Sequence, residues 1–137
     1  RDPTSIAEEF HDLFSGIGRG ELVPYASYYL TGFLHEKPLA RLRQDMAGLG
    51  IERAPGVSEP EDHAASLLDI MAGLIDGSFG ASASLLDQRS LFDRHLAGWL
   101  PHFFRDLEQA KAAVLYGALA TVGRRFLEIE AAALTMD

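Results

Sequence analysis

Residues 115–129, LYGALATVGRRFLEI, carry the clearest periodic signal in the chain. Large apolar side chains recur there at intervals of three and four residues, at Leu115, Leu119, Val122, Phe126 and Ile129. This spacing places them on one face of a helix, because an α-helix has about 3.6 residues per turn. No stretch of the chain alternates between apolar and polar residues for long enough to indicate a strand. The segment therefore predicts an all-α fold.

The rest of the chain follows the same pattern, with prolines, glycines and capping residues marking where helices begin and end. Working back from residue 115, helices are expected over residues 84–97, 58–77, 38–48, 24–33 and 5–15, with a short segment at 103–107. Because the 24–33 segment is apolar on nearly all sides, it is expected to be deeply buried. The prediction is one all-helical domain spanning residues 1–137, a single bundle of about six or seven helices.

Composition excludes several classes of protein. The chain has 137 residues and is 47% apolar, enough for one globular domain. It has no cysteine, which excludes disulfides, thiol nucleophiles and thiolate metal sites and fits a reducing compartment. A net charge of −8 argues against nucleic-acid binding and favours cationic partners. No apolar run approaches the roughly 20 residues of a membrane span, and no signal peptide is visible.

Two features could indicate an enzyme. Glycines alternate from Gly16 to Gly20, but this G-x-G-x-G turn between two helices matches neither the dinucleotide fingerprint nor the P-loop. A helix end and turn is the simpler interpretation, with nucleotide binding as the alternative. Five histidines occur without the Glu-x-x-His pairs of a di-iron bundle, although His102 and Asp106 could share a helix face. No catalytic residue, metal or cofactor is predicted.

The segment Glu59-Pro60-Glu61-Asp62-His63 concentrates charge at a predicted helix start. Ser58 and Glu61 are spaced as a capping box, and carboxylates suit the positive end of a helix dipole. Capping does not explain His63, because a helix N-terminus disfavours an imidazolium. A second interpretation is a site in which carboxylates and a histidine hold an arginine or a peptide amine. Both interpretations stay open.

Aromatic residues cluster in two segments of the sequence, residues 25–33 and 99–104. Most are expected in the core, but tyrosines combine an apolar ring with a polar tip, which also suits a groove for an apolar peptide. Core and groove remain equally good interpretations of this set: Tyr25, Tyr28, Tyr29, Phe33, Trp99, Phe103 and Phe104.

Together, these residues resemble the TorD/DmsD/NarJ family of redox-enzyme maturation chaperones, most closely its TorD-type members. The family signature E-P-x-D-H is matched in full at residues 59–63. The family's aromatic element, Tyr-x-x-Leu-Phe, is matched only loosely at residues 25–29. Familiar stretches also occur at residues 18–30 and 95–104, so the likeness spans nearly the whole chain.

The resemblance implies an all-helical cytoplasmic chaperone and not an enzyme. Such a chaperone binds the twin-arginine leader of a molybdenum-cofactor oxidoreductase and delays export of the apo-enzyme until the cofactor is inserted. By similarity, Asp62 and His63 would bind the leader, with the helix start and the tyrosines shaping the groove. The full set of implied signal-peptide-binding residues is Asp62, His63, Glu59, Pro60, Glu61, Tyr25, Tyr28 and Tyr29.

Two alternatives differ in their ligand. A NarJ-like chaperone would assemble a molybdoenzyme that has no exported leader. A small helical nucleotide- or metal-dependent enzyme is the alternative from another class, against which the missing motifs argue.

Family members usually have several helices before the position that matches Thr4, so the chain is expected to be an N-terminally truncated fragment. Loss of those helices would expose the apolar stripes of Phe10, Phe14 and residues 25–33. Exposure of such side chains drives association, because burying each is worth about 1.5–3 kcal/mol. A homodimer is therefore predicted, with exchanged helices as one form that the family shows.

Overall fold

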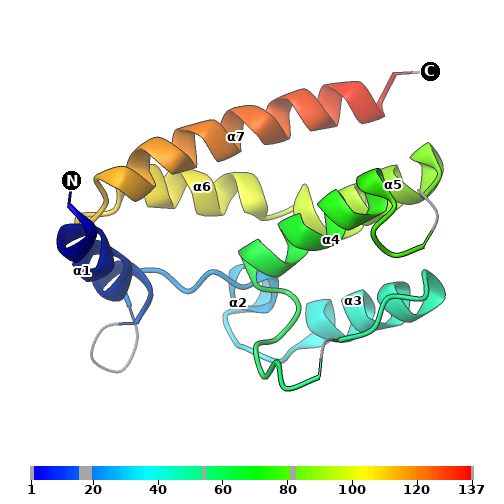
Figure 1. Cartoon of the computed structure of the whole chain (residues 1–137), viewed down its shortest axis with the longest axis horizontal. Coiled ribbons are helices and arrows are strands. Elements are labelled where there is room, and N and C mark those ends of the chain that lie inside the picture. The colour runs from blue at the N-terminus through cyan, green and yellow to red at the C-terminus, as the bar shows by residue number, and fades with distance from the viewer. Residues whose placement is uncertain (1, 16–19, 54, 81–82, 137) are drawn as a thin grey trace.

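The computed structural model describes residues 2–15, 20–53, 55–80 and 83–136 (Figure 1). In these residues the chain forms helices and no strand, which confirms the all-α prediction. The glycine turn at residues 16–20 lies, except for Gly20, outside the described residues. The elements are α1 (Pro3–Phe14), α2 (Ala26–Thr31), α3 (Lys37–Gly48), α4 (Ala64–Asp76), α5 (Leu85–Leu91), the π-helix η1 (Phe92–Leu96), α6 (Leu100–Gln109) and α7 (Leu115–Leu134).

Helices α6 and α7 form an antiparallel hairpin along one side of the molecule (Figure 1). Close packing within this hairpin requires a glycine, because a Cβ at Gly123 would lie 2.6 Å from the Phe104 ring. Helices α3, α4 and α5 form a second group, and α2 lies beside the start of α3 (Figure 1). Helix α1 lies against the start of α7, where the rings of Phe14 and Tyr116 meet edge to face at 5.5 Å.

Some helix starts follow the predicted capping chemistry. Pro38 lies in the first turn of α3, whose Leu39, Leu42 and Met46 are buried as the spacing predicts. Ser84 caps α5, since its hydroxyl accepts from the Asp87 N–H at 3.1 Å. Helix α1 begins two residues earlier than expected, because the Asp2 carboxylate caps it by accepting from the Ser5 N–H at 2.8 Å.

The start of α4 corrects the sequence prediction. The helix begins at Ala64 and not near Ser58, and its N-cap is His63. The capping box fails because Glu61 does not turn back to Ser58. Its carboxylate binds Arg43 on α3 instead, with Nε–Oε2 and Nη2–Oε1 distances of 2.9 and 3.1 Å. The sequence pattern around Ser58 matches a capping box, but Glu61 pairs with Arg43, which lies 18 positions away in the sequence.

The 24–33 segment is less buried than predicted. Only Ala26 and Ser27 of α2 are buried, whereas Leu30 and Phe33 are 53% and 68% exposed. The helix is only six residues long, so its first turn packs inward and its end points outward. The core instead lies between α3, α4, η1 and α6, with Leu67, Leu96, Trp99 and Leu100 among the most buried side chains.

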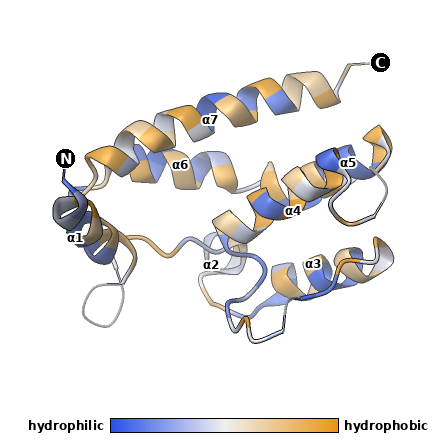
Figure 2. Cartoon of the chain, viewed as in Figure 1, coloured by the Kyte–Doolittle hydropathy of each residue, from blue (hydrophilic) through white to orange (hydrophobic). Residues whose placement is uncertain are grey.

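The periodic stripe of α7 is helical, as predicted, but it lies at the surface. Leu119, Val122 and Ile129 are 50%, 66% and 66% exposed. The face of α7 that packs inward is marked by Ala120 and Leu127. Figure 2 shows hydrophobic residues along much of α7. An apolar stripe identifies the residues that share one face of a helix, but it does not show that this face is buried.

Candidate functional site

A short backbone bridge brings the tyrosine segment and the acidic signature together. Residues 25 and 63 pair as an isolated antiparallel bridge. The Ala26 N–H donates to the Asp62 carbonyl at 3.0 Å, and the Ala64 N–H donates to the Pro24 carbonyl at 2.9 Å. The first turns of α2 and α4 therefore meet, although the two segments are more than 30 residues apart in the sequence.

The Asp62 carboxylate is used inside the protein. Its side chain is buried, with only 1% of the residue exposed, and Oδ2 accepts from the Ser27 N–H at 2.8 Å. This bond satisfies a free amide in the first turn of α2, whose own N-cap residue, Tyr25, makes no side-chain cap bond. Asp62 is thus the capping acid of a helix that lies far from it in sequence.

Glu61 is also engaged by the protein. The guanidinium of Arg43 forms a two-bond fork with its carboxylate, and Arg53 lies 3.7 Å away. The bonds from Arg43 hold the pKa of Glu61 below its usual range, against a smaller opposing effect of burial. Pro60 is half-buried, and its carbonyl accepts from the His63 N–H at 3.2 Å. These contacts fix the turn that leads into α4.

His63 caps α4 as a neutral imidazole. Its Nδ1 accepts from the Ala65 N–H at 3.0 Å, which requires an unprotonated Nδ1 and assigns the ring proton to Nε2. Burial lowers the pKa of His63, while the charges of Glu59 and Asp62 oppose that shift. A histidine at a helix start is therefore compatible with the helix dipole, because it is uncharged.

Glu59 and Tyr25 lie on the outer side of this histidine. The Tyr25 hydroxyl donates to Glu59 Oε1, and the Tyr25 ring meets the His63 ring edge to face at 5.0 Å. Glu59 remains exposed, so its carboxylate can still meet an incoming cation. Among the predicted acids, Glu59 is the one that the structure leaves at the surface.

Tyr29 packs away from His63, against Trp99 and helix α6. Its hydroxyl donates to Asp106 Oδ2 at 2.7 Å, and its ring lies 5.4 Å from Trp99 and 6.0 Å from Phe103. Burial and the bond to Asp106 raise the pKa of Tyr29. Tyr28 is half-buried, and its ring meets the Tyr29 ring at 6.3 Å. Tyr29 joins α2 to α6, whereas Tyr25 borders His63.

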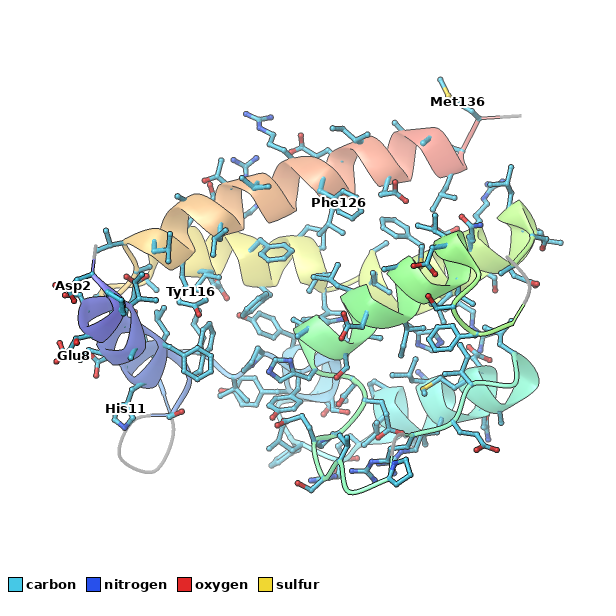
Figure 3. All side chains as sticks on the ribbon, in the orientation of Figure 1. Asp2, Glu8, His11, Tyr116, Phe126 and Met136 are labelled. Carbon is cyan, nitrogen blue, oxygen red and sulfur yellow. The ribbon has the colours of Figure 1, made fainter. Side chains whose placement is uncertain are left out.

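An apolar groove of about 290 Å³ opens beside His63. Figure 3 shows Tyr116 on the side of α7 that faces α1. The lining residues come from the segment before α2 and from α1, α4, α6 and α7: Pro24, Phe10, Phe14, His63, Ala64, Ala65, Leu68, Phe103, Phe104, Leu107, Tyr116, Leu119 and Ala120. Phe103 and Phe104 thus serve both core and groove, and Tyr25, Tyr28 and Tyr29 are not among the lining residues.

Sequence reasoning missed most of the groove wall. Phe10, Phe14, Tyr116 and Leu119 come from segments about 100 positions apart. The sequence indicated only that the apolar stripes of residues 5–15 and 115–129 would each pack against another part of the protein. Where those faces meet depends on tertiary packing, which a single sequence does not reveal.

The arrangement suits a ligand that is apolar along most of its length and positively charged at one point. The groove wall carries no lysine or arginine. The exposed carboxylate of Glu59 is connected to His63, a residue of that wall, through Tyr25. In the part of the chain that the structure describes, no cluster of three metal-ligating side chains occurs. Among these residues, no helix is long and apolar enough to cross a membrane.

Comparisons with known proteins place the chain in a family. The model of the family described as "Nitrate reductase delta subunit" matches residues 1–105. The chaperone protein TorD of Vibrio cholerae serotype O1 is 35% identical over 130 residues, which cover 90% of this chain and 59% of TorD. The TorD of a Psychrobacter species is 32% identical over 104 residues, or 72% of this chain and 47% of that protein.

The chain therefore spans less than two thirds of the length of these relatives. Both are named as chaperones and not as enzymes, in agreement with the expectation of a non-enzyme. The matched regions include the signature at residues 59–63 within the family model's range. The chain belongs to the nitrate reductase delta subunit family, to which the TorD chaperones are related, as its signature predicted.

Proposed function

We propose that the protein is a cytoplasmic chaperone that binds the twin-arginine leader of a molybdenum-cofactor oxidoreductase. It would hold the apo-enzyme back from export until the cofactor is inserted. One observation carries the proposal: His63 lines an apolar groove, and its ring meets Tyr25, whose hydroxyl bonds to the exposed carboxylate of Glu59. A twin-arginine leader has the matching chemistry, because a pair of guanidinium groups precedes an apolar stretch.

The signature residues and the tyrosines would have different roles in leader binding. Glu59 would meet an arginine, and His63 would offer its Nε2 proton and ring edge at the mouth of the groove. Tyr25 would hold Glu59 in place through its hydroxyl. Pro60 and Glu61 would shape the turn, Asp62 would join it to α2, and Tyr28 and Tyr29 would support α2 from the other side.

Charge supports the same ligand. The chain carries a net charge of −8, and none of the groove-lining residues is a lysine or an arginine. A negative protein attracts a positively charged peptide over a distance and raises its association rate. The apolar wall then determines how long the peptide stays, since most affinity differences lie in the dissociation rate.

A second candidate follows from the family description. A nitrate reductase delta subunit is named for an enzyme subunit and not for an exported leader. The groove of this chain could then receive an apolar segment of the apo-enzyme itself. This NarJ-like alternative predicts binding to a remnant leader or to the body of an apo-enzyme that carries no exported leader.

Association of two copies is part of the proposal. The α7 stripe presents Leu119, Val122, Phe126 and Ile129 at 43–66% exposure. Burial of such a stripe against a second copy would stabilise a homodimer. Light scattering over a concentration series should show a mass that rises toward the dimer. A monomer mass at every concentration would rule this out.

Peptide titration tests the leader proposal. Trp99 is the only tryptophan and its ring lies 5.4 Å from Tyr29, so its fluorescence should report movement of α2. A twin-arginine leader peptide should bind saturably, and more weakly when Lys-Lys replaces Arg-Arg, because lysine lacks the guanidinium fork. Added salt should weaken binding further.

Two variants locate the charge effect. Glu59→Gln should weaken binding, whereas Asp93→Asn, which makes the same charge change on η1 away from the groove, should not. Equal affinity of Glu59→Gln and the wild type for the twin-arginine peptide would remove the carboxylate from the proposal. Absence of leader binding combined with capture of the leaderless apo-enzyme would select the NarJ-like alternative.

A further inference from the structure

Asp62 serves α2 with two different atoms. Its carbonyl accepts from the Ala26 N–H at 3.0 Å, and its Oδ2 accepts from the Ser27 N–H at 2.8 Å. These two amides belong to the first turn of α2, where no intrahelical acceptor exists. Both Asp62 and Ser27 are almost fully buried, at 1% and 0% exposure. One residue of the signature therefore fixes where α2 begins.

The side chain of Asp62 does not line the apolar groove. It lines a separate cavity of about 40 Å³, whose wall also includes Arg41, Arg94 and His95. This volume has room for a few water molecules only. A guanidinium that entered there would also meet two arginines of like charge. The cavity thus excludes the ligand that the Asp62 charge would otherwise suit.

The position of α2 controls the groups at the groove mouth. The turn that Asp62 caps is preceded by Tyr25, which bonds to Glu59 and meets the His63 ring. The following turn carries Tyr29, which bonds to Asp106 on α6. Loss of the bond at Ser27 would release the start of α2 and with it the spacing between Tyr25 and His63.

The geometry points to Asp62 as a positioning residue that clamps α2 onto the entry to α4 and does not contact the leader. The binding part of this inference rests on the proposed function. What matters at Asp62 is then an oxygen that accepts from the Ser27 N–H, and the negative charge is dispensable. Direct reading of the leader's arginines falls to Glu59, which is exposed.

Three variants separate acceptor from charge. Asp62→Ala removes both, Asp62→Asn keeps an acceptor oxygen without the charge, and Glu59→Gln removes the exposed charge. We expect Asp62→Ala to weaken leader binding on the order of tenfold, and Asp62→Asn to restore affinity to within about threefold of the wild type. Asp62→Asn should keep the wild-type salt dependence of binding, whereas Glu59→Gln should flatten it.

Amide hydrogen exchange supplies a readout without peptide. The Ser27 amide should exchange slowly in the wild type and in Asp62→Asn, and rapidly in Asp62→Ala. Asp62→Asn answers the question even where Asp62→Ala fails to fold. Loss of affinity in Asp62→Asn with a protected Ser27 amide would overturn the inference and make the charge a direct contact.

The two proposals fail in different ways. A wild-type protein that binds no leader peptide would refute the proposed function and leave the clamp to be decided by exchange at Ser27. A Ser27 amide that stays protected in a folded Asp62→Ala would refute the clamp, whatever the affinity for the leader.

Discussion

Two regions of the molecule use the same apolar residue types with opposite results. In the region built from α3, α4, η1 and α6, Leu42 and Leu67 are 1% and 0% exposed. On α7, Leu119, Val122 and Ile129 are 50%, 66% and 66% exposed, although their helical spacing is the clearest in the chain. Periodicity therefore shows which side chains share a face. Burial depends on whether another element covers that face, and of these three α7 residues only Leu119 lines the groove.

A matched pair of leucines should give the largest difference between the two regions. Leu67→Ala removes a side chain with no exposed surface and should lower the free energy of unfolding by about 2–5 kcal/mol. Leu119→Ala removes the same atoms from a half-exposed position and should cost less than about 1 kcal/mol. Urea unfolding of both variants measures the difference. Equal losses would show that α7 is covered in solution, for example by a second copy.

The fold could be predicted where its signals are local. The first turn of α3 with Pro38 and the Ser84 cap of α5 involve residues within one turn of each other. The start of α4 could not be predicted, because Arg43 competes with the local cap for Glu61. The π-helix Phe92–Leu96 also gave no signal. At the start of α4 a tertiary contact outweighed a local preference.

The site shows the same limit. The signature located the correct segment, since residues 59–63 do meet Tyr25. It could not show that Asp62 is buried and Glu59 exposed, because the two acids differ only in what packs around them. The neutral state of His63 was also hidden, since it depends on burial. Residue types predicted the chemistry of the site, and packing determined which atoms remain available.

Two carboxylates, one buried and one exposed, bind backbone N–H groups of the segment that leads from α6 into α7. They extend the comparison between buried and exposed positions to a smaller expected effect. Glu9 is buried and accepts from the N–H groups of Val114, Leu115 and Tyr116 at 2.7–3.1 Å. Glu21 is exposed and accepts from the N–H groups of residues 111 and 112 at 2.7 and 3.2 Å. Both tie the N-terminal part of the chain to the start of α7.

Replacement by glutamine should separate these two acids. Glu9→Gln turns an amide NH₂ toward backbone donors in a buried place and should cost about 1–3 kcal/mol of unfolding free energy. Glu21→Gln should cost less than about 1 kcal/mol, because water can replace its bonds. Thermal unfolding at one pH compares them. A larger loss in Glu21→Gln than in Glu9→Gln would contradict this ranking by burial.

The smallest expected effect concerns His63, which borders both regions. Burial lowers the pKa of His63 in the folded state below its ordinary value of 6.5, so the unfolded chain binds more protons than the folded chain as the pH falls below that value. Stability from the neutral cap is therefore fully present above about pH 6.5 and declines as the pH falls toward the folded-state pKa. The midpoint of urea unfolding, measured from pH 7.5 downward, should fall in this sense.

His63→Asn supplies the control, because asparagine caps a helix through an oxygen that does not titrate. Its unfolding midpoint should change less than that of the wild type just below pH 6.5. The lowered pKa of Glu61 causes a loss of stability only below the ordinary glutamate pKa of 4.5, and that loss is common to both proteins. An apolar peptide in the groove would remove more water from His63 and lower its pKa further. The affinity of the wild type for the peptide should then decrease as the pH is lowered, whereas the affinity of His63→Asn should stay constant. Identical pH profiles of affinity for the two proteins would place His63 outside the bound surface.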